Sequence, residues 1–181
     1  MTNMTIDTLV KRGFDRPHVG LAGMDTQKLK AMRNNALKAC FNRLEETHYR
    51  LEHTATIRGR EYINDAAART VNATWYSLES MQGGVVWIAC GGKKDIDYSR
   101  LRPLVQRKVR MLLVLGDSEG LKKSMAQAVP QIVECQDMSE ALHKAHYYDS
   151  DDIKVLFSPA SDEVASTEDL GEMFRYEVNE L

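Results

Sequence analysis

Short, continuous apolar runs alternate with amphipathic segments along most of the second half of the chain. The runs lie at 85–90, 111–116, 131–135 and 154–159. A continuous apolar run of this length is typical of a strand buried on both faces of a parallel sheet. Helical spacing of apolar residues follows each run, and these expected helices span 99–106, 118–128, 137–147 and a last segment capped by Ser166 or Thr167.

The first half combines an amphipathic segment with a hairpin pattern. Apolar side chains recur at three- and four-residue intervals after Asp25, which predicts a helix to about residue 46. Residues 1–23 contain several glycines and little periodicity, so we expect a lead-in or arm there. Residues 50–57 alternate in polarity, and 61–63 return after a turn, which is typical of two paired strands.

The stretch 62–81 holds an Asn-Asp pair between a strand end and a helix pattern. We expect the helix to follow Asn64 and Asp65 directly and to end at Gly83-Gly84. A helix start presents unpaired N–H groups and positive potential, so the pair could serve a ligand. A carboxylate at this place is equally typical of a plain helix N-cap. The pattern leaves both interpretations open.

Strands that alternate with helices predict a parallel sheet with helices on both faces. The fold class expected is therefore α/β, a Rossmann-like three-layer domain with a mostly parallel sheet, preceded by a helical N-terminal arm. We place the arm, with one amphipathic helix, at residues 1–47 and the α/β domain at 48–181. Ligands in such sheets bind beyond the carboxyl ends of the strands.

Composition narrows the class of protein. The chain has 181 residues, 43% of them hydrophobic and 28% charged, with a net charge of −2. Nothing in this balance favours nucleic-acid binding, and no run is long enough to cross a membrane. The N-terminus lacks the apolar core of a signal peptide, so a cytoplasmic location is expected. The three cysteines are far apart and are interpreted as reduced and structural.

Generic catalytic patterns are lacking in the sequence. His143 and His146 could share one helix face, but a third ligand is missing, so we predict no metal site. No Ser-His-Asp or Cys-His order is recognisable, and no catalytic residue is assigned.

Four motifs in order resemble a known family. They are YRLEH at 49–53, YINDAAARTVNAT at 62–74, ACGGKKDIDYSRL at 89–101 and VLFSPAS at 155–161. Together they resemble the C-terminal domain of the Mur ligases, most closely the ligases that add D-glutamate to UDP-N-acetylmuramoyl-L-alanine. The resemblance covers about residues 48–181. It implies a Rossmann-like domain from enzymes that use ATP to form an acyl phosphate.

The resemblance implies roles for particular side chains. Arg50 matches an arginine that reaches the nucleotide phosphates, and Asp65, preceded by Asn64, matches an aspartate of the ATP site. Lys94 matches a loop lysine that binds the carboxylate of the incoming amino acid. Ser158 belongs to the matching Ser-Pro-Ala segment. From the residues alone, an arginine on an alternating strand is more typical of a surface or ion-pair position.

Three departures from the family pattern weaken the expected chemistry. Ala67 stands where the family has lysine, and Arg69 stands where it has threonine. Arg69 could replace a missing cation with different geometry. After Ala160 the family's serine-aromatic segment is replaced by an acidic one that begins at Asp162, and like charges there would repel an anionic amino acid. The ligand-binding candidates are Arg50, Asn64, Asp65, Arg69, Lys94 and Ser158.

The sequence also lacks the P-loop pattern G-x-x-x-x-G-K-[ST] that holds ATP phosphates. We therefore expect a stand-alone homologue that is not an autonomous ligase and that has a binding or regulatory role linked to peptidoglycan precursor synthesis. One alternative is one chain of a split ATP-dependent ligase, in which case ATP and Mg²⁺ would act with a partner P-loop domain. Another is a structural scaffold. A protein partner, or self-association through the N-terminal helix, is expected.

Overall fold

The computed structural model describes residues 27, 30–36, 48–91, 96–150, 152–162 and 165–181. The chain divides into two compact units, Met1–Asn35 and Ala36–Leu181. Residues 27 and 30–36 are helical, and Met32 is 56% exposed. The rest of the expected N-terminal helix and Lys94 lie outside the described residues, so the arm boundary at 47 stays a prediction.

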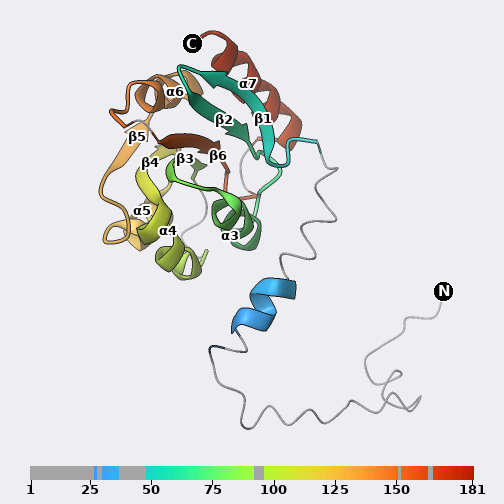
Figure 1. Ribbon diagram of the computed structural model, residues 1–181, viewed down its shortest axis with the longest axis vertical. Helices are drawn as coiled ribbons and strands as arrows, with labels where there is room; N and C mark the ends of the chain where they lie inside the picture. The colour runs from blue at the N-terminus through green and yellow to red at the C-terminus, as the bar shows by residue number, and fades with distance from the viewer. Residues whose placement is uncertain (1–26, 28–29, 37–47, 92–95, 151, 163–164) are drawn as a thin grey trace, which may run out of the picture. The chain divides into compact units, whose positions relative to one another are not determined.

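A six-stranded sheet forms the centre of the second unit (Figure 1). The strand order is β1-β2-β6-β3-β4-β5, in which β1 and β2 are antiparallel and all other neighbours are parallel. The strands are β1 (Glu52–Ile57), β2 (Arg60–Asn64), β3 (Gly84–Cys90), β4 (Val109–Leu115), β5 (Ile132–Cys135) and β6 (Ile153–Phe157). This confirms the mostly parallel α/β sheet and the hairpin.

Helices cover both faces of the sheet, as the three-layer prediction requires (Figure 1). They are α3 (Val71–Ser80), α4 (Arg102–Lys108), α5 (Glu119–Met125), α6 (Met138–His146) and α7 (Thr167–Asn179), with a short 3-10 turn, Ser99–Leu101, before α4. Helices α6 and α7 pack on one face, and α3, α4 and α5 pack on the other.

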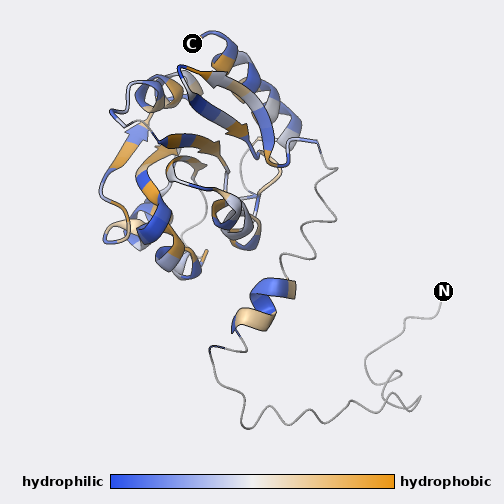
Figure 2. Cartoon of the chain, viewed as in Figure 1, coloured by the Kyte–Doolittle hydropathy of each residue, from blue (hydrophilic) through white to orange (hydrophobic). Residues whose placement is uncertain are grey.

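Strand β3 shows why its run is continuously apolar. Val86 and Ile88 enter the core under α6 and α7, whereas Val85 and Trp87 enter the core under α3, α4 and α5. Alternate side chains thus point to opposite faces, and both faces are buried. Figure 2 shows mostly apolar residues in the central strands, whereas the helices contain both polar and apolar residues.

The start of α3 corrects one expectation. The helix begins at Val71, and its N-cap is Thr70, whose side chain accepts a hydrogen bond from the Ala73 N–H. The interpretation of Asp65 as the N-cap is therefore wrong. Asp65 lies six residues earlier, where its own N–H donates to the Phe157 carbonyl at 2.9 Å.

Three further properties of the described residues concern membrane crossing, metal binding and thiol chemistry. No helix among them combines the length and apolar character that crossing a membrane requires. Nor do their His, Cys, Asp and Glu side chains form a group of three or more suited to a metal ion. Cys90 and Cys135 are buried free thiols, and burial raises the pKa of Cys90 to about 12.

Candidate functional site

Two polar features lie where β2, β3 and β6 end. One is a buried cluster around Asp65, and the other is an open pocket beside the start of α3. The carboxyl ends of parallel strands are the usual place for a ligand in this class of fold. The buried cluster and the pocket are separate, because none of the residues of the cluster lines the pocket.

The buried cluster is an ion pair closed by hydrogen bonds. Arg50 Nη1 donates to Asp65 Oδ1 at 2.5 Å and to Ser77 Oγ at 3.0 Å, and Ser77 Oγ donates to the second carboxylate oxygen. The Leu51 N–H also donates to Asp65 Oδ1, at 3.1 Å. Arg50 is 7% exposed and Asp65 is 0% exposed. The ion-pair interpretation of Arg50 is confirmed, and the surface interpretation is wrong.

Burial dominates the electrostatics of this cluster. It raises the pKa of Asp65 from 3.8 to about 6, although the charge of Arg50 and the hydrogen bonds from Ser77 and Leu51 act in the opposite direction. A buried carboxylate that keeps its charge needs such partners, because transfer out of water penalises the charged form. Asp65 therefore has its acceptor capacity committed to the fold of its own chain.

The backbone on either side of Arg50 has an unusual conformation, which directs the Arg50 side chain into the interior. Tyr49 and Leu51, its two neighbours, both have positive φ, at 58° and 48°. Such angles are uncommon outside glycine and are held only where surrounding contacts determine them. The Tyr49 carbonyl accepts the Ala67 N–H at 3.1 Å, so Ala67, at the family's lysine position, is part of the same local structure.

Two other predicted binding residues also hold the fold. The Asn64 side chain donates to the Gly171 carbonyl at 3.0 Å, which ties β2 to α7. Ser158 Oγ lies 2.9 Å from Thr74 Oγ1, and the Ser158 carbonyl accepts the Trp87 indole N–H at 2.9 Å. Asn64 and Ser158 are both fully buried.

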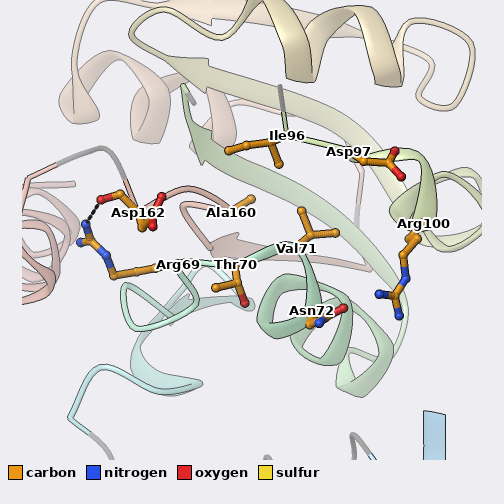
Figure 3. Close-up of a pocket in the computed structure, with 9 residues that line it drawn as sticks. All are labelled: Arg69, Thr70, Val71, Asn72, Ile96, Asp97, Arg100, Ala160 and Asp162. Atoms are coloured by element: carbon orange, nitrogen blue, oxygen red, sulfur yellow. Dashed lines mark hydrogen bonds between the residues drawn. The ribbon is translucent and has the colours of Figure 1, made fainter. Parts of the chain in front are cut away.

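The pocket has a volume of about 430 Å³ and opens between three loops. It is lined by Arg69, Thr70, Val71, Asn72, Ile96, Asp97, Arg100, Ala160 and Asp162. Figure 3 shows Arg69 and Asp162 toward one end and Asp97 and Arg100 toward the other, with Val71, Ile96 and Ala160 between them. The cavity therefore has charges at both ends and an apolar middle.

Among the predicted binding residues that the structure describes, only Arg69 lines this pocket. Its guanidinium donates to the carbonyls of Asp162 and Ala165, each at 2.7 Å, so the β2–α3 loop is joined to the loop after β6 (Figure 3). The first turn of α3 contributes Thr70, Val71 and Asn72. An α-helix N-terminus carries partial positive charge, which favours an anionic group nearby.

The opposite end contains an ordered carboxylate. Asp97 accepts the Ser99 N–H at 2.9 Å, and the hydrogen bonds from Ser99 hold the pKa of Asp97 below its usual value. Next to it in sequence, Tyr98 is fully buried, and burial followed by the charge of Asp162 raises its pKa. Its hydroxyl has no hydrogen-bond partner among the described residues.

Thr70, Ile96 and Arg100 line the pocket but are not among the binding residues predicted from the sequence. A threonine followed by Val-Asn-Ala is a recognisable N-cap pattern, so Thr70 could have been found from capping preferences. Ile96 and Arg100 become neighbours of the α3 start only because β3 lies next to β6, which in turn pairs with β2. That order is a long-range property that the local pattern does not contain.

Comparison with known proteins places the chain in a family. No protein-family model matches it. It is 35% identical over 182 aligned positions to UDP-N-acetylmuramoylalanine–D-glutamate ligase of Porphyromonas gingivalis, and 32% identical to that of Salinibacter ruber. Each alignment covers 98% of this chain. The ligase of the same name from Cytophaga hutchinsonii is 38% identical over 137 positions.

The chain spans about 40% of the length of the first two relatives. Among solved structures, MurF ligase from Thermotoga maritima in complex with ADP matches with a TM-score of 0.47 and 14% identity, over 73% of this chain and 31% of that chain. By its sequence similarity and its α/β architecture, the chain belongs with the C-terminal domains of the Mur ligases.

Proposed function

We propose that this domain binds a small, amino-acid-like ligand in the pocket beside α3 and does not itself catalyse ligation. The observation that carries the proposal is the closed Arg50–Asp65–Ser77 cluster. A group that acts on a nucleotide must offer its charge to the ligand. Here the guanidinium and the carboxylate are buried against each other.

The loop after Asp65 supports the same proposal. Phosphoryl transfer depends on cations placed around the developing negative charge. Position 67 is an alanine, and the Arg69 guanidinium donates to two backbone carbonyls of the loop after β6. The cation that the family supplies at position 67 is thus missing. The pocket, in contrast, keeps the size and mixed lining of a small-molecule site.

A second candidate is one chain of a split ligase that acts with a partner P-loop domain, together with ATP and Mg²⁺. Its support is the similarity to ligases over 98% of the chain. In that case Arg50 would have to leave Asp65 when the partner docks. On the basis of the resemblance we also propose a regulatory role linked to peptidoglycan precursor synthesis. A cytoplasmic location and association through the N-terminal helix are proposed as well.

An NMR titration tests the binding proposal. Glycine, alanine, glutamate and ornithine, the last three in both enantiomers, are added one at a time at millimolar concentration to the ¹⁵N-labelled full chain. We expect at least one of them to shift the amides of Thr70, Val71 and Asn72, because these residues line the pocket. Val71→Tyr, which fills the cavity, should remove the shifts while the remaining spectrum is retained.

The control is Glu172→Gln, an exposed change on α7 that leaves the pocket lining intact and should preserve the shifts. If no compound shifts any pocket amide, the proposed function fails. Shifts confined to Ser77 and its neighbours would place the ligand at the buried cluster and would also contradict the proposal.

A further inference from the structure

The acidic side chains of the pocket affect which ligands can bind there. Among the described residues, two carboxylates, Asp97 and Asp162, line the cavity together with two guanidinium groups, Arg69 and Arg100. Asp162 stands in the acidic segment that follows Ala160. Both aspartates are exposed, so they remain accessible to a ligand.

At this end of the pocket, the Arg69 guanidinium and the Asp162 carboxylate differ in their hydrogen bonding. Arg69 donates to backbone carbonyls, including the carbonyl of Asp162 rather than its carboxylate (Figure 3). Within the described residues, no hydrogen bond or ion pair involves the Asp162 carboxylate. The Arg69 guanidinium is therefore anchored to the loop, while the neighbouring carboxylate still faces the open site.

The surroundings of Asp162 add a second polar group. The Tyr98 hydroxyl is buried, has no partner among the described residues, and lies close enough to Asp162 to be affected by its charge. A buried polar atom without a partner is uncommon in a folded protein.

From this arrangement we infer that the pocket selects an amino acid with a positively charged side chain over a dicarboxylate, and that Asp162 determines this specificity. The inference rests on the proposed function of the same pocket. A diamino acid carries two ammonium groups and one carboxylate. The ammonium groups are matched by Asp97 and Asp162, and the carboxylate by the N-terminal turn of α3.

Electrostatics sets the direction of the preference. Replacing an ammonium by a carboxylate beside Asp162 turns an attraction into a repulsion. Exposed charge pairs contribute little individually, so the combined effect is about tenfold in the dissociation constant. Such a preference should decrease as salt concentration rises, because exposed charges are screened.

Isothermal titration calorimetry on the full chain tests the inference with ornithine and glutamate of the same handedness. Ornithine is expected to bind about tenfold more tightly than glutamate. Asp162→Asn should bring the two affinities within about threefold of each other. The backbone carbonyl of residue 162, which accepts a hydrogen bond from Arg69, is unchanged in this variant, so the pocket should keep its shape.

Glu172→Gln removes an exposed carboxylate from α7 without touching the pocket, and it should keep the full preference. Tighter or equal binding of glutamate to the wild type would overturn the inference while leaving the proposed function standing. So would an unchanged preference in Asp162→Asn. If neither compound binds but glycine or alanine does, the inference fails while the proposed function stands. If none of the four amino acids binds, the proposed function itself fails.

Discussion

Replacing Arg50 with methionine is expected to lower the free energy of unfolding at neutral pH by about 3–5 kcal/mol. Methionine keeps most of the volume but leaves the fully buried Asp65 carboxylate without its counter-charge. Removing one partner of a buried ion pair lowers the free energy of unfolding by more than the intact pair contributes to it, because the remaining charge stays desolvated. Urea unfolding at neutral pH measures the loss.

The pH dependence of this loss identifies its cause. The folded pKa of Asp65 is raised from 3.8 to about 6, so the folded state binds the proton more tightly than the unfolded state. The contribution of this group to stability is therefore complete below about pH 4 and decreases by roughly 2–3 kcal/mol as pH rises through about 6. Arg50→Met should accordingly cost less near pH 4, where Asp65 is neutral.

Arg107→Met provides the matched control. Arg107 pairs with Glu79 at 3.5 Å on the surface, where its side chain is 67% exposed, so its loss should cost less than about 1 kcal/mol. If Arg50→Met were as mild as Arg107→Met at neutral pH, the buried pair would not be structural. Arg50 and Asp65 would then be open to a ligand role.

Gly91→Ala is expected to lower the free energy of unfolding by about 3 kcal/mol or more. A Cβ at Gly91 would lie 1.7 Å from the carbonyl oxygen of Asp117 and 2.3 Å from its carbonyl carbon. Both are backbone atoms of the loop after β4, so no side-chain rotation relieves the contact. The Gly91 N–H also donates to the Leu115 carbonyl at 2.7 Å, which holds the two segments together.

Gly59→Ala is the comparison for this variant. Gly59 has a φ of +79°, but no atom lies within 4 Å of its Cβ position, so only the backbone angle is unfavourable. We expect a loss of about 1 kcal/mol there. A loss at Gly91 no larger than at Gly59, measured by urea unfolding of both variants, would show that the glycine is not required for packing.

The strands and helices were predictable because the core imposes its pattern locally. A strand buried on both faces must be apolar throughout, as in β3, and its length is visible in the sequence. The start of α3 was misplaced because Ala66, Ala67 and Ala68 favour a helix. In the structure, the Ala68 N–H donates to the Asp65 carbonyl in a turn, the Ala67 N–H donates to the distant Tyr49 carbonyl, and Thr70 caps the helix.

The candidate site was only partly predictable. Sequence similarity identified Arg50 and Asp65 but could not reveal that they are buried against each other, because this depends on the inward course of the backbone at residues 49–51. Asp162 is recognisable in the sequence as part of the acidic segment that follows Ala160. Its position opposite Asp97 follows from the adjacency of β3 and β6, which is decided by packing across the whole sheet.

The central claim is that this Mur ligase-like domain binds without ligating, and phosphate release from ATP tests it most directly. The full chain is mixed with ATP, Mg²⁺, UDP-N-acetylmuramoylalanine and D-glutamate or ornithine, alone and together with a Mur ligase truncated before its C-terminal domain. We predict no phosphate release above the ATP background in either case. Release that requires both this chain and the amino acid would contradict the account and would establish the split ligase instead.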